Sequence, residues 1–224
     1  MRILKIFLLV FILSINTTAQ QGWFQQTSGV NNHLLNVFFI DENLGWVVGD
    51  LMTILKTTNG GEDWFILLSL GLPESILDIF FKDQYNGMIV GGSPTNTVAR
   101  ITTDGGYYWF SVSAGTSSIL SDVFFVDDNT GWIVGNWGVL LNTTNGGWNW
   151  NTKNSGTNNH LSRIVFTDIN NGIIIGRWGM ILRSTDGGEN WFSQPSGTGN
   201  SLNDISFANE NNGLIVGEVM LKSI

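Results

Sequence analysis

Carboxylates are the residues of this sequence that come nearest to forming a catalytic site. Hydrolysis of a glycosidic bond needs two carboxylates that face each other across a cleft, roughly 5 to 10 Å apart. Asp78, Asp122 and Glu218 are the acidic residues that could approach this geometry. Motifs of other chemistries, such as Gly-x-Ser-x-Gly, His-Glu-x-x-His and the phosphate loop, do not occur in the sequence. We find no complete catalytic constellation and expect a protein that is not an enzyme.

A group of tryptophan, arginine and polar residues could instead bind a ligand. Trp137 follows Asn136 and Trp178 follows Arg177, and neither indole belongs to the repeated motifs described below. An indole beside such polar groups could stack on a sugar ring or anchor a protein contact; the alternative is that both indoles pack inside the molecule. Arg163 and Arg177 could pair with a carboxylate of a partner. The candidate binding residues are Asp50, Asn136, Trp137, Arg163, Arg177, Trp178 and Glu218.

The two histidines do not predict a metal site. His33 and His160 recur in the same phrase, Asn-Asn-His-Leu, and the sequence has no cysteine. Two histidines in separate repeats, without clustered acids, lack the ligand set that a metal ion needs. We expect both to pack in loops, and we expect no metal and no cofactor.

The first twenty residues have the composition of a secretory signal peptide. Arg2 and Lys5 precede an apolar stretch, residues 6–15, which is shorter than the roughly 20 residues that span a bilayer. Cleavage is therefore favoured over an uncleaved membrane anchor. We expect a signal peptide over residues 1–20 and a mature domain over residues 21–224. The mature protein would be secreted, periplasmic or at the cell surface, with no stable membrane span.

The charge balance argues against nucleic acid as a partner. The net charge is −8, and removing Arg2 and Lys5 with the leader changes it to −8 − 2 = −10. Binding to nucleic acid depends on clusters of Lys and Arg, which this chain lacks. An exported chain without cysteine forms no disulfides, so we expect its stability to come from its core.

A repeated element must position all of these candidates. A phrase that begins Phe-x-Asp/Asn and ends with two glycines four residues apart occurs five times; the first of these glycines step by 42, 44, 41 and 41 residues, at Gly45, Gly87, Gly131, Gly172 and Gly213. The first unit divides into four short strands, over residues 35–40, 46–49 and 53–58, with the fourth beginning at Trp64. Four strands per repeat of this length predict an all-β protein, a β-propeller of five four-stranded antiparallel units.

A second phrase marks the turn between the third and fourth strands of four units. It reads Ser/Thr-x-Asp/Asn-x-Gly-x-x-Trp. Glycine accepts left-handed backbone angles, the Asp or Asn oxygen accepts hydrogen bonds from turn amides, and the Trp can cover the hairpin. The structural positions are Asn59, Gly61, Trp64, Asp104, Gly106, Trp109, Asn145, Gly147, Trp150, Asp186, Gly188 and Trp191.

This second phrase resembles the Asp-box, or BNR repeat, of sialidases, xyloglucan-active glycoside hydrolases and sortilin-type propellers. Combined with the glycine phrase, it looks more specifically like the photosystem II stability and assembly factor family, which has secreted bacterial relatives. The resemblance extends from about Gly22 to the end of the sequence and implies a propeller with an assembly partner. A sialidase would need an arginine triad and a Tyr–Glu pair, but Tyr107 and Tyr108 lie in a box turn.

The ends of the sequence are compatible with two arrangements. The sequence of residues 22–34 resembles that of the fourth strands of the repeat, and the sequence of residues 217–224 resembles that of the third strands. The strand over residues 22–30 would then close the last blade and complete a five-bladed ring, which is the arrangement we favour. The alternative is a fragment of a larger propeller, since propellers of the resembled family usually have seven blades.

The fold predicts where ligands bind. The box turns lie on one face, and the turns between second and third strands lie on the other, at the mouth of the central channel. One residue of each first strand predicts a partly acidic ring around the channel, namely Asn36, Asp78, Asp122, Arg163 and Asp204. We expect this ring to hold water, and the alternative is a cation. We expect a noncatalytic module that binds a protein partner at the channel mouth; the alternative is carbohydrate binding within a glycan-degrading system.

Overall fold

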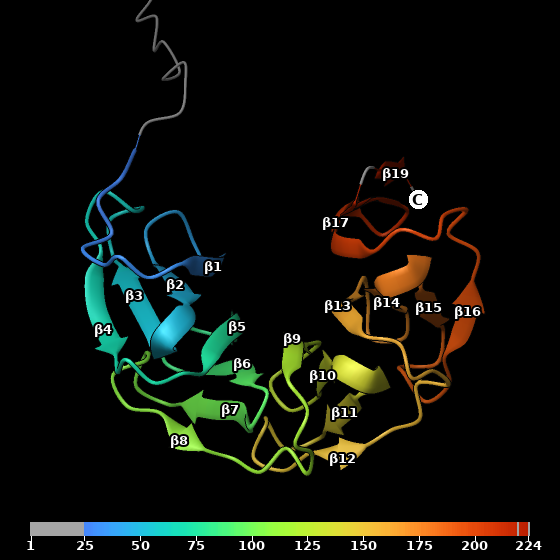
Figure 1. Cartoon of the computed structure of the whole chain (residues 1–224), viewed down its shortest axis with the longest axis horizontal. Helices are drawn as coiled ribbons and strands as arrows, with labels where there is room; N and C mark the ends of the chain where they lie inside the picture. Colours follow the sequence, from blue (N-terminus) through green and yellow to red (C-terminus); the bar gives the residue numbers. More distant parts are fainter. Residues whose placement is uncertain (1–24, 219, 224) are drawn as a thin grey trace, which may run out of the picture.

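Five antiparallel sheets, named A to E in chain order, follow one another around an arc (Figure 1). The computed structural model describes residues 25–218 and 220–223, so the predicted signal peptide lies outside the described residues. Sheet A contains β1 (Leu34–Phe39), β2 (Gly45–Gly49), β3 (Thr53–Thr57) and β4 (Phe65–Ser69). Sheet B contains β5 (Ser75–Phe81), β6 (Gly87–Ser93), β7 (Asn96–Thr102) and β8 (Phe110–Ser111).

The remaining sheets repeat this order. Sheet C contains β9 (Leu120–Phe125), β10 (Gly131–Gly135), β11 (Leu140–Thr143) and β12 (Asn151–Thr152). Sheet D contains β13 (Leu161–Phe166), β14 (Gly172–Gly176), β15 (Ile181–Ser184) and β16 (Phe192–Gln194). Sheet E has three strands among the described residues, β17 (Leu202–Asn209), β18 (Asn212–Gly217) and β19 (Met220–Ser223). The predicted all-β propeller architecture is confirmed, with the predicted strands of sheet A correct to within one residue.

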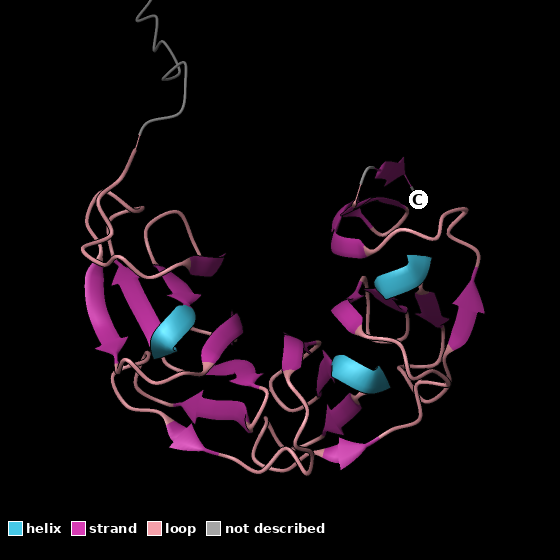
Figure 2. Cartoon of the chain, in the orientation of Figure 1, coloured by secondary structure: helices cyan, strands magenta, loops and turns pink. Residues whose placement is uncertain are grey.

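Among the residues that the structure describes, helical geometry is confined to three short turns that follow second strands, η1 (Asp50–Met52), η2 (Asn136–Gly138) and η3 (Arg177–Gly179). All three lie on the same face of the arc (Figure 2). Within residues 25–218 and 220–223, no helix has the length and hydrophobicity to cross a membrane.

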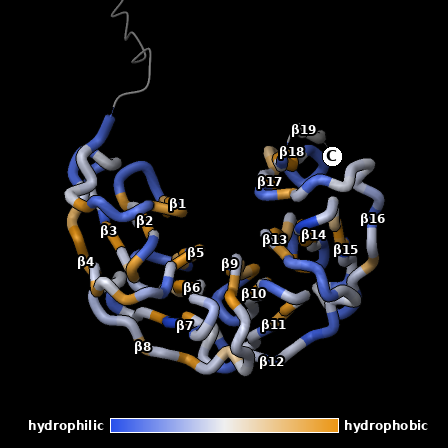
Figure 3. The backbone as a smooth tube through the Cα atoms, in the orientation of Figure 1, coloured by the Kyte–Doolittle hydropathy of each residue, from blue (hydrophilic) through white to orange (hydrophobic). Residues whose placement is uncertain are grey.

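The hydrophobic core lies between consecutive sheets, and apolar residues concentrate in the strands (Figure 3). Between sheets A and B, the indole of Trp46 stacks on Phe81 with ring centroids 3.6 Å apart and planes 9° apart. Between sheets C and D, Trp132 packs on Phe166 with centroids 5.9 Å apart. Consecutive sheets therefore bury the apolar faces that they turn toward each other, as propeller blades do.

The Asp-box turns form as predicted. In sheet B, the Thr102 hydroxyl accepts a hydrogen bond from the Gly106 amide at 3.0 Å, and Asp104 Oδ1 accepts one from the Tyr108 amide at 2.9 Å. The Trp109 indole donates to the Gly106 carbonyl at 2.9 Å and meets Phe81 edge-on at 6.1 Å. The same hydroxyl and carboxamide or carboxylate bonds recur in the turns of sheets A, C and D.

Every first strand carries a β-bulge at the same place. In β1 the pairing with β2 passes from Leu34 directly to Asn36, which leaves Leu35 unpaired, and the other four first strands do the same. The bulged residues are Leu35, Leu77, Ser121, Ser162 and Asn203. Because a bulge redirects the following side chains, it fixes how the next residue meets the neighbouring sheet.

The two end sheets lie at opposite ends of the arc (Figure 1). Residues 25–30 lie beside sheet A, where Gln26 Oε1 accepts a hydrogen bond from the Trp64 indole at 3.0 Å. These residues form no strand with β19. The predicted closing strand also includes residues 22–24, which lie outside the described residues, so the described part of the chain does not show the predicted closure.

Candidate functional site

Three left-handed turns lie on one face of the arc, which we call the channel-mouth face after the prediction from the sequence. Leu51, Trp137 and Trp178 have φ angles of 57°, 61° and 60° and occupy the same position in η1, η2 and η3. In η2 the next residue is Gly138, with φ 73°, and the Val139 amide donates to the Asn136 carbonyl at 3.3 Å. Two successive residues with positive φ make a two-residue hairpin turn of the primed type, which matches the twist of the strands.

Backbone contacts hold these turns in place. The Asn136 amide donates to the Ile119 carbonyl at 3.0 Å, and the Arg177 amide donates to the His160 carbonyl at 2.9 Å. A Cβ atom at Gly138 would lie 1.9 Å from the Thr157 carbonyl oxygen, so only glycine fits there. These backbone contacts therefore fix the position of each turn and of the side chain at its tip.

The indoles at these tips face solvent. Trp137 is 68% exposed and Trp178 is 73% exposed, so the alternative that they pack between blades is wrong. A bulky residue in the left-handed region costs roughly 1 to 2 kcal/mol, and here most of each indole stays exposed, so burial offsets little of that cost. Strain of this kind concentrates at functional sites.

A hollow of about 420 Å³ opens on the same face. Asn136, Arg163 and Arg177 line it together with His160 and the bulged residues of the first strands. Arg177 forms no ion pair and no side-chain hydrogen bond within the described residues, so its charge is available to a ligand. Of the predicted binding residues, the structure brings these three together.

His160 belongs to the wall of the hollow. Its ring lies 4.8 Å from the Trp137 indole, and its Nδ1 atom is enclosed without a hydrogen-bond partner. Partial burial lowers the pKa of His160, and the positive charge of Arg177 lowers it further. The imidazole is therefore neutral at pH 7, as expected for a packing residue, but it also supports Trp137.

Arg163 is not a free cation. Its Nη1 atom lies 3.6 Å from Asp122 Oδ1 and its Nε atom 3.3 Å from Asp204 Oδ1. Arg163 is therefore paired within the protein and forms part of the channel wall. The Asp50 carboxylate is also bonded within the protein, because its Oδ1 atom accepts a hydrogen bond from the Ser75 hydroxyl at 2.6 Å.

Glu218 occupies the matching turn position of sheet E, where its amide donates to the Ser201 carbonyl at 3.0 Å. Neither Asp50 nor Glu218 lines the hollow that contains Arg177.

The predicted ring around the channel joins the sheets. Asp78 Oδ2 accepts a hydrogen bond from the Val123 amide of sheet C at 2.9 Å, and Asp122 Oδ2 accepts one from the Ile164 amide of sheet D at 2.7 Å. The Asn36 side-chain amide donates to the other oxygen of Asp78. Each carboxylate thus links its own first strand to the next one.

Burial sets the protonation of these two carboxyl groups. It raises the pKa of Asp78 to about 6, against the opposing effects of the Val123 amide and Arg163. Burial also raises the pKa of Asp122 well above its usual value, and the neighbouring charge of Asp78 raises it further. The two carboxylates of a glycosidase flank an open cleft. Those of Asp78 and Asp122 are buried and accept hydrogen bonds from backbone amides, so this pair does not have that arrangement.

Metal ligands are not gathered anywhere in the described part of the chain, where no group of three or more His, Asp or Glu side chains could hold an ion. Sequence reasoning missed two members of the channel-mouth face. Leu51 could have been found, because it aligns with Trp137 in the repeat. The place of His160 in the wall depends on the fold of the linker before β13, which the sequence pattern does not specify.

Comparison with known proteins supports the fold. Residues 107–196, which include all of sheets C and D, match the family model described as photosynthesis system II assembly factor YCF48. The chain is similar to the structure of YCF48 from Cyanidioschyzon merolae, with 21% identity and a TM-score of 0.68, over 86% of this chain and 66% of that one. A search of curated protein sequences found no significant match.

Two further structures show the same likeness. YCF48 bound to a D1 peptide has 18% identity and a TM-score of 0.50, over 87% of this chain and 91% of that one. The GH74 xyloglucanase from Xanthomonas campestris has 12% identity and a TM-score of 0.63, over 83% of this chain and 34% of that one. The predicted resemblance is confirmed: the chain has the BNR-type propeller fold of these proteins, and it spans just under two thirds of the C. merolae protein and one third of the xyloglucanase.

Proposed function

We propose that the chain is a noncatalytic interaction module that binds a segment of a protein partner at its channel-mouth face. The observation that carries this proposal is the exposure of Trp137 and Trp178 on strained, rigid turns. Exposed Trp and Arg side chains commonly dominate the binding energy of protein interfaces. The similarity to YCF48, whose structure with a D1 peptide is known, supports a peptide segment as the bound element.

Each side chain of the face has a separate role in this proposal. Trp137 and Trp178 cover apolar parts of the segment, because each indole offers a flat apolar surface and one N–H donor. Arg177 pairs with a carboxylate of the segment, since no carboxylate within the described residues neutralises it. Arg163 stays in the wall and contributes shape and charge rather than a direct contact.

A displayed library of random peptides tests the proposal. Peptides are selected on the parent protein alone, and the affinity of the enriched peptides for the parent and for the variant Trp137→Asn/Arg177→Gln/Trp178→Asn is measured by calorimetry. We expect at least a tenfold loss of affinity in the variant, while Glu62→Gln, an exposed change in the box turn at the other end of β3 from η1, has no effect. Peptides that bind the triple variant as tightly as the parent would overturn the proposal.

Carbohydrate binding is a second candidate, because exposed indoles beside Asn136 and Arg177 also suit a sugar ring. The fold similarity to a xyloglucanase makes xyloglucan oligosaccharides the first ligands to titrate. Saturable binding that is lost in Trp137→Asn and Trp178→Asn, together with failure of the peptide selection, would favour this candidate.

We also propose that the protein is exported, on the basis of the charged and apolar pattern of residues 1–20. Mass spectrometry of the protein recovered from a cell-envelope fraction tests this. The expected mass is that of a chain that begins near residue 21, and an intact N-terminus in that fraction contradicts cleavage.

A further inference from the structure

The box turns form a face of their own. Each lies at the opposite end of its third strand from the turn that follows the second strand, and we call this side of the molecule the box-turn face. The turns between first and second strands lie on it too. The Gly105 amide donates to the Tyr85 carbonyl at 2.9 Å in sheet B, and the Gly146 amide donates to the Asn129 carbonyl at 2.8 Å in sheet C. Side chains from both kinds of turn therefore share one surface.

Exposed aromatic side chains gather on this face in sheets B and C. They are Tyr107, Tyr108, Phe110 and Trp148, which we call the aromatic strip, and they are between 42% and 71% exposed. The centroid of the Phe110 ring lies 4.8 Å from that of Tyr108 and 6.2 Å from that of Trp148. The strip thus continues from one box turn to the next, and contiguous exposed patches of this kind commonly mark interaction sites.

The box turn itself does not require aromatic residues at these positions. Sheet A carries Glu62 and sheet D carries Glu189 where sheets B and C carry Tyr107 and Trp148. In all four sheets the amide of the second glycine nevertheless donates to the Ser or Thr hydroxyl of the turn. The aromatic residues of the strip are therefore not needed to form the turns that carry them.

Unpaired carboxylates border the strip. Four of them lie in the turns that carry or adjoin it, namely Asp83, Asp104, Asp127 and Asp128. All four are exposed, and none forms an ion pair within residues 25–218 and 220–223. The backbone amides of Tyr108 and Thr130 are the main causes that lower the pKa of Asp104 and of Asp127, respectively, so both stay charged at pH 7.

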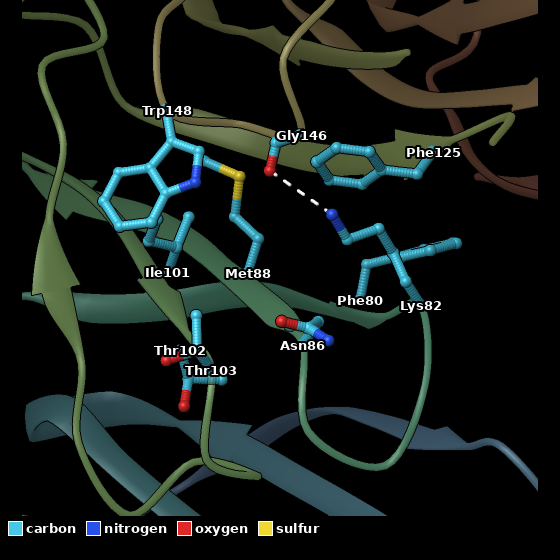
Figure 4. A pocket seen from close by; sticks show the side chains of 11 residues that line it. Phe80, Lys82, Asn86, Met88, Ile101, Thr102, Thr103, Phe125, Gly146 and Trp148 are labelled. Atoms are coloured by element: carbon cyan, nitrogen blue, oxygen red, sulfur yellow. Dashed lines mark hydrogen bonds between the residues drawn. The ribbon is translucent and has the colours of Figure 1, made fainter. Parts of the chain in front are cut away.

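The two lysines of this region do not balance these charges. Lys56 is buried, and its Nζ atom donates to the Gly105 carbonyl at 3.1 Å. Lys82 Nζ donates to the Asp128 carbonyl at 2.8 Å and to the Gly146 carbonyl at 3.4 Å, beside Trp148 (Figure 4). Both ammonium groups are thus bonded to backbone carbonyls, and the four carboxylates outnumber them. The surface around the strip keeps a net negative charge.

Aromatic rings bordered by carboxylates favour a basic segment as the occupant. The planar guanidinium group of arginine stacks on aromatic faces and also pairs with carboxylates. Lys56 Nζ, 5.0 Å from the centroid of the Tyr107 ring, shows that the strip already contacts one cation. A second copy of this chain, with its net charge of −8, would bring further negative charge to the face. A membrane of anionic lipids is disfavoured for the same reason.

We propose that the aromatic strip is a docking site for a basic, arginine-containing segment of a protein partner. Guanidinium groups stack on Tyr108 and Trp148, and the carboxylates beside the strip pair with them. The site lies at the opposite end of the strands from Trp137 and Trp178, and it does not depend on the function proposed for the channel mouth.

A labelled basic peptide tests the site. The probe is trifluoroacetyl-Gly-Arg-Ala-Arg-Ala-Arg-amide, and its ¹⁹F signal is followed during titration with the protein at low salt. We expect saturable binding that Tyr108→Asn/Trp148→Gln, a change without effect on charge, weakens at least tenfold. Phe192→Asn removes an exposed aromatic side chain outside the strip, at a position where sheet C has Asn151, and is the matched control that leaves binding unchanged. Equal binding by the double variant and the parent, or no binding by the parent, overturns the proposal.

The charge of the site is tested separately. Asp128→Asn neutralises an exposed carboxylate and keeps the backbone carbonyl that Lys82 contacts. We expect it to weaken binding at least threefold at low salt and by less at high salt, where charges are screened. Should Tyr108→Asn/Trp148→Gln fail to melt cooperatively, this variant decides instead, and an unchanged affinity contradicts the proposal. A probe with glutamate in place of each arginine is expected not to bind, and equal binding of that probe contradicts a basic partner.

Two controls identify the ligand and the face. Acetyl-arginine-amide is expected to bind at least tenfold more weakly than the probe, and equal binding contradicts docking of a protein segment. The channel-mouth variant Trp137→Asn/Trp178→Asn is expected to bind the probe normally, since the probe has no carboxylate for Arg177. A loss of binding in that variant would place the probe at the channel mouth and overturn the assignment to the strip.

Discussion

Trp137 and Trp178 adopt a backbone conformation that is unfavourable for a bulky residue, and their side chains remain mostly exposed. Asn followed by Gly is the preferred pair for a turn of this primed type, and each of these tryptophans already precedes a glycine. The protein therefore keeps an indole where an asparagine would fold better. This is the pattern expected when a residue is retained for binding rather than for stability.

The first prediction is that Trp137→Asn and Trp178→Asn each raise the free energy of unfolding, by up to about 1 kcal/mol, because asparagine tolerates the left-handed region. Urea unfolding at pH 7 measures the change. Leu51→Asn, at the same turn position of sheet A, is the matched control and should stabilise the protein as well. A loss of stability in both tryptophan variants would show that the indoles pack against the protein in solution.

At the scale of single elements, the Asp-box turn depends on an acceptor oxygen rather than on a negative charge. Asp104 and Asp186 hold the turns of sheets B and D, while Asn59 and Asn145 hold those of sheets A and C with the same bonds. Backbone amides lower the pKa of Asp104, chiefly the amide of Tyr108. The turn thus favours the carboxylate form without requiring it.

Asp104→Ala should therefore lower the free energy of unfolding by about 1 kcal/mol, because the turn amides lose their acceptor. Asp104→Asn should change it by less than about 0.5 kcal/mol, since Asn59 and Asn145 fill the same role. Chemical denaturation of the two variants beside the parent is the measurement. Equal losses in Asp104→Ala and Asp104→Asn would mean that the charge itself holds the turn.

The junctions between sheets predict a dependence of stability on pH. The folded protein holds protons on Asp78 and Asp122 at pH values where the unfolded chain has lost them, because both pKa values are raised. Stability from this pair is therefore highest below about pH 4 and falls as the pH rises toward 6 and above. The slope approaches about 1.4 kcal/mol per pH unit for each retained proton.

Thermal unfolding between pH 4 and pH 8 tests this slope. Asp122→Asn should flatten it, because asparagine still accepts the Ile164 amide but adds no second charge beside Asp78. Asp204→Asn, which changes an exposed partner of Arg163, should leave the slope unchanged. A slope in Asp122→Asn as steep as that of the parent contradicts the raised pKa values.

For the whole molecule, the two end sheets differ from the inner ones in what covers them. Val37 and Phe39 of sheet A are 55% and 41% exposed, whereas Ile79 and Phe81, their equivalents in sheet B, are buried against Trp46. Phe125 and Phe166 are buried in the same way by sheets B and C. Among the described residues, one apolar face of sheet A is therefore left in contact with solvent.

Phe39→Ala should accordingly lower the free energy of unfolding by less than about 1 kcal/mol. Phe125→Ala should lower it by about 3 to 5 kcal/mol, the usual effect of removing a fully buried phenylalanine. Equilibrium unfolding of the two variants decides between an open arc and a closed ring. If the ring closes in solution, sheet A gains a neighbour and the two losses become similar.

The repeat made much of this architecture predictable from the sequence. The spacing of the glycine phrases located the strands, and the Ser/Thr-x-Asp/Asn-x-Gly-x-x-Trp phrase located the turns and their hydrogen bonds. The sequence could not show that Trp137 and Trp178 are exposed, because an indole at a turn tip and one between sheets have the same local pattern. Nor could it show that Arg163 is paired, since its partners Asp122 and Asp204 lie in neighbouring repeats.

The contacts between sheets have a consequence for how such a chain can evolve. Sheets B, C and D contact one another through the same two kinds of interaction. An apolar side chain packs against an aromatic ring, and a carboxylate accepts a hydrogen bond from a backbone amide of the next sheet. Duplicating the gene segment for the unit of sheet C would supply both halves of a new junction at once, because that unit carries both the carboxylate of Asp122 and the amide of Val123. Point mutation within a duplicated unit would then change one junction alone, and the junctions do differ in this way, since the position held by Trp46 and Trp132 in sheets A and C is held by Met88 in sheet B.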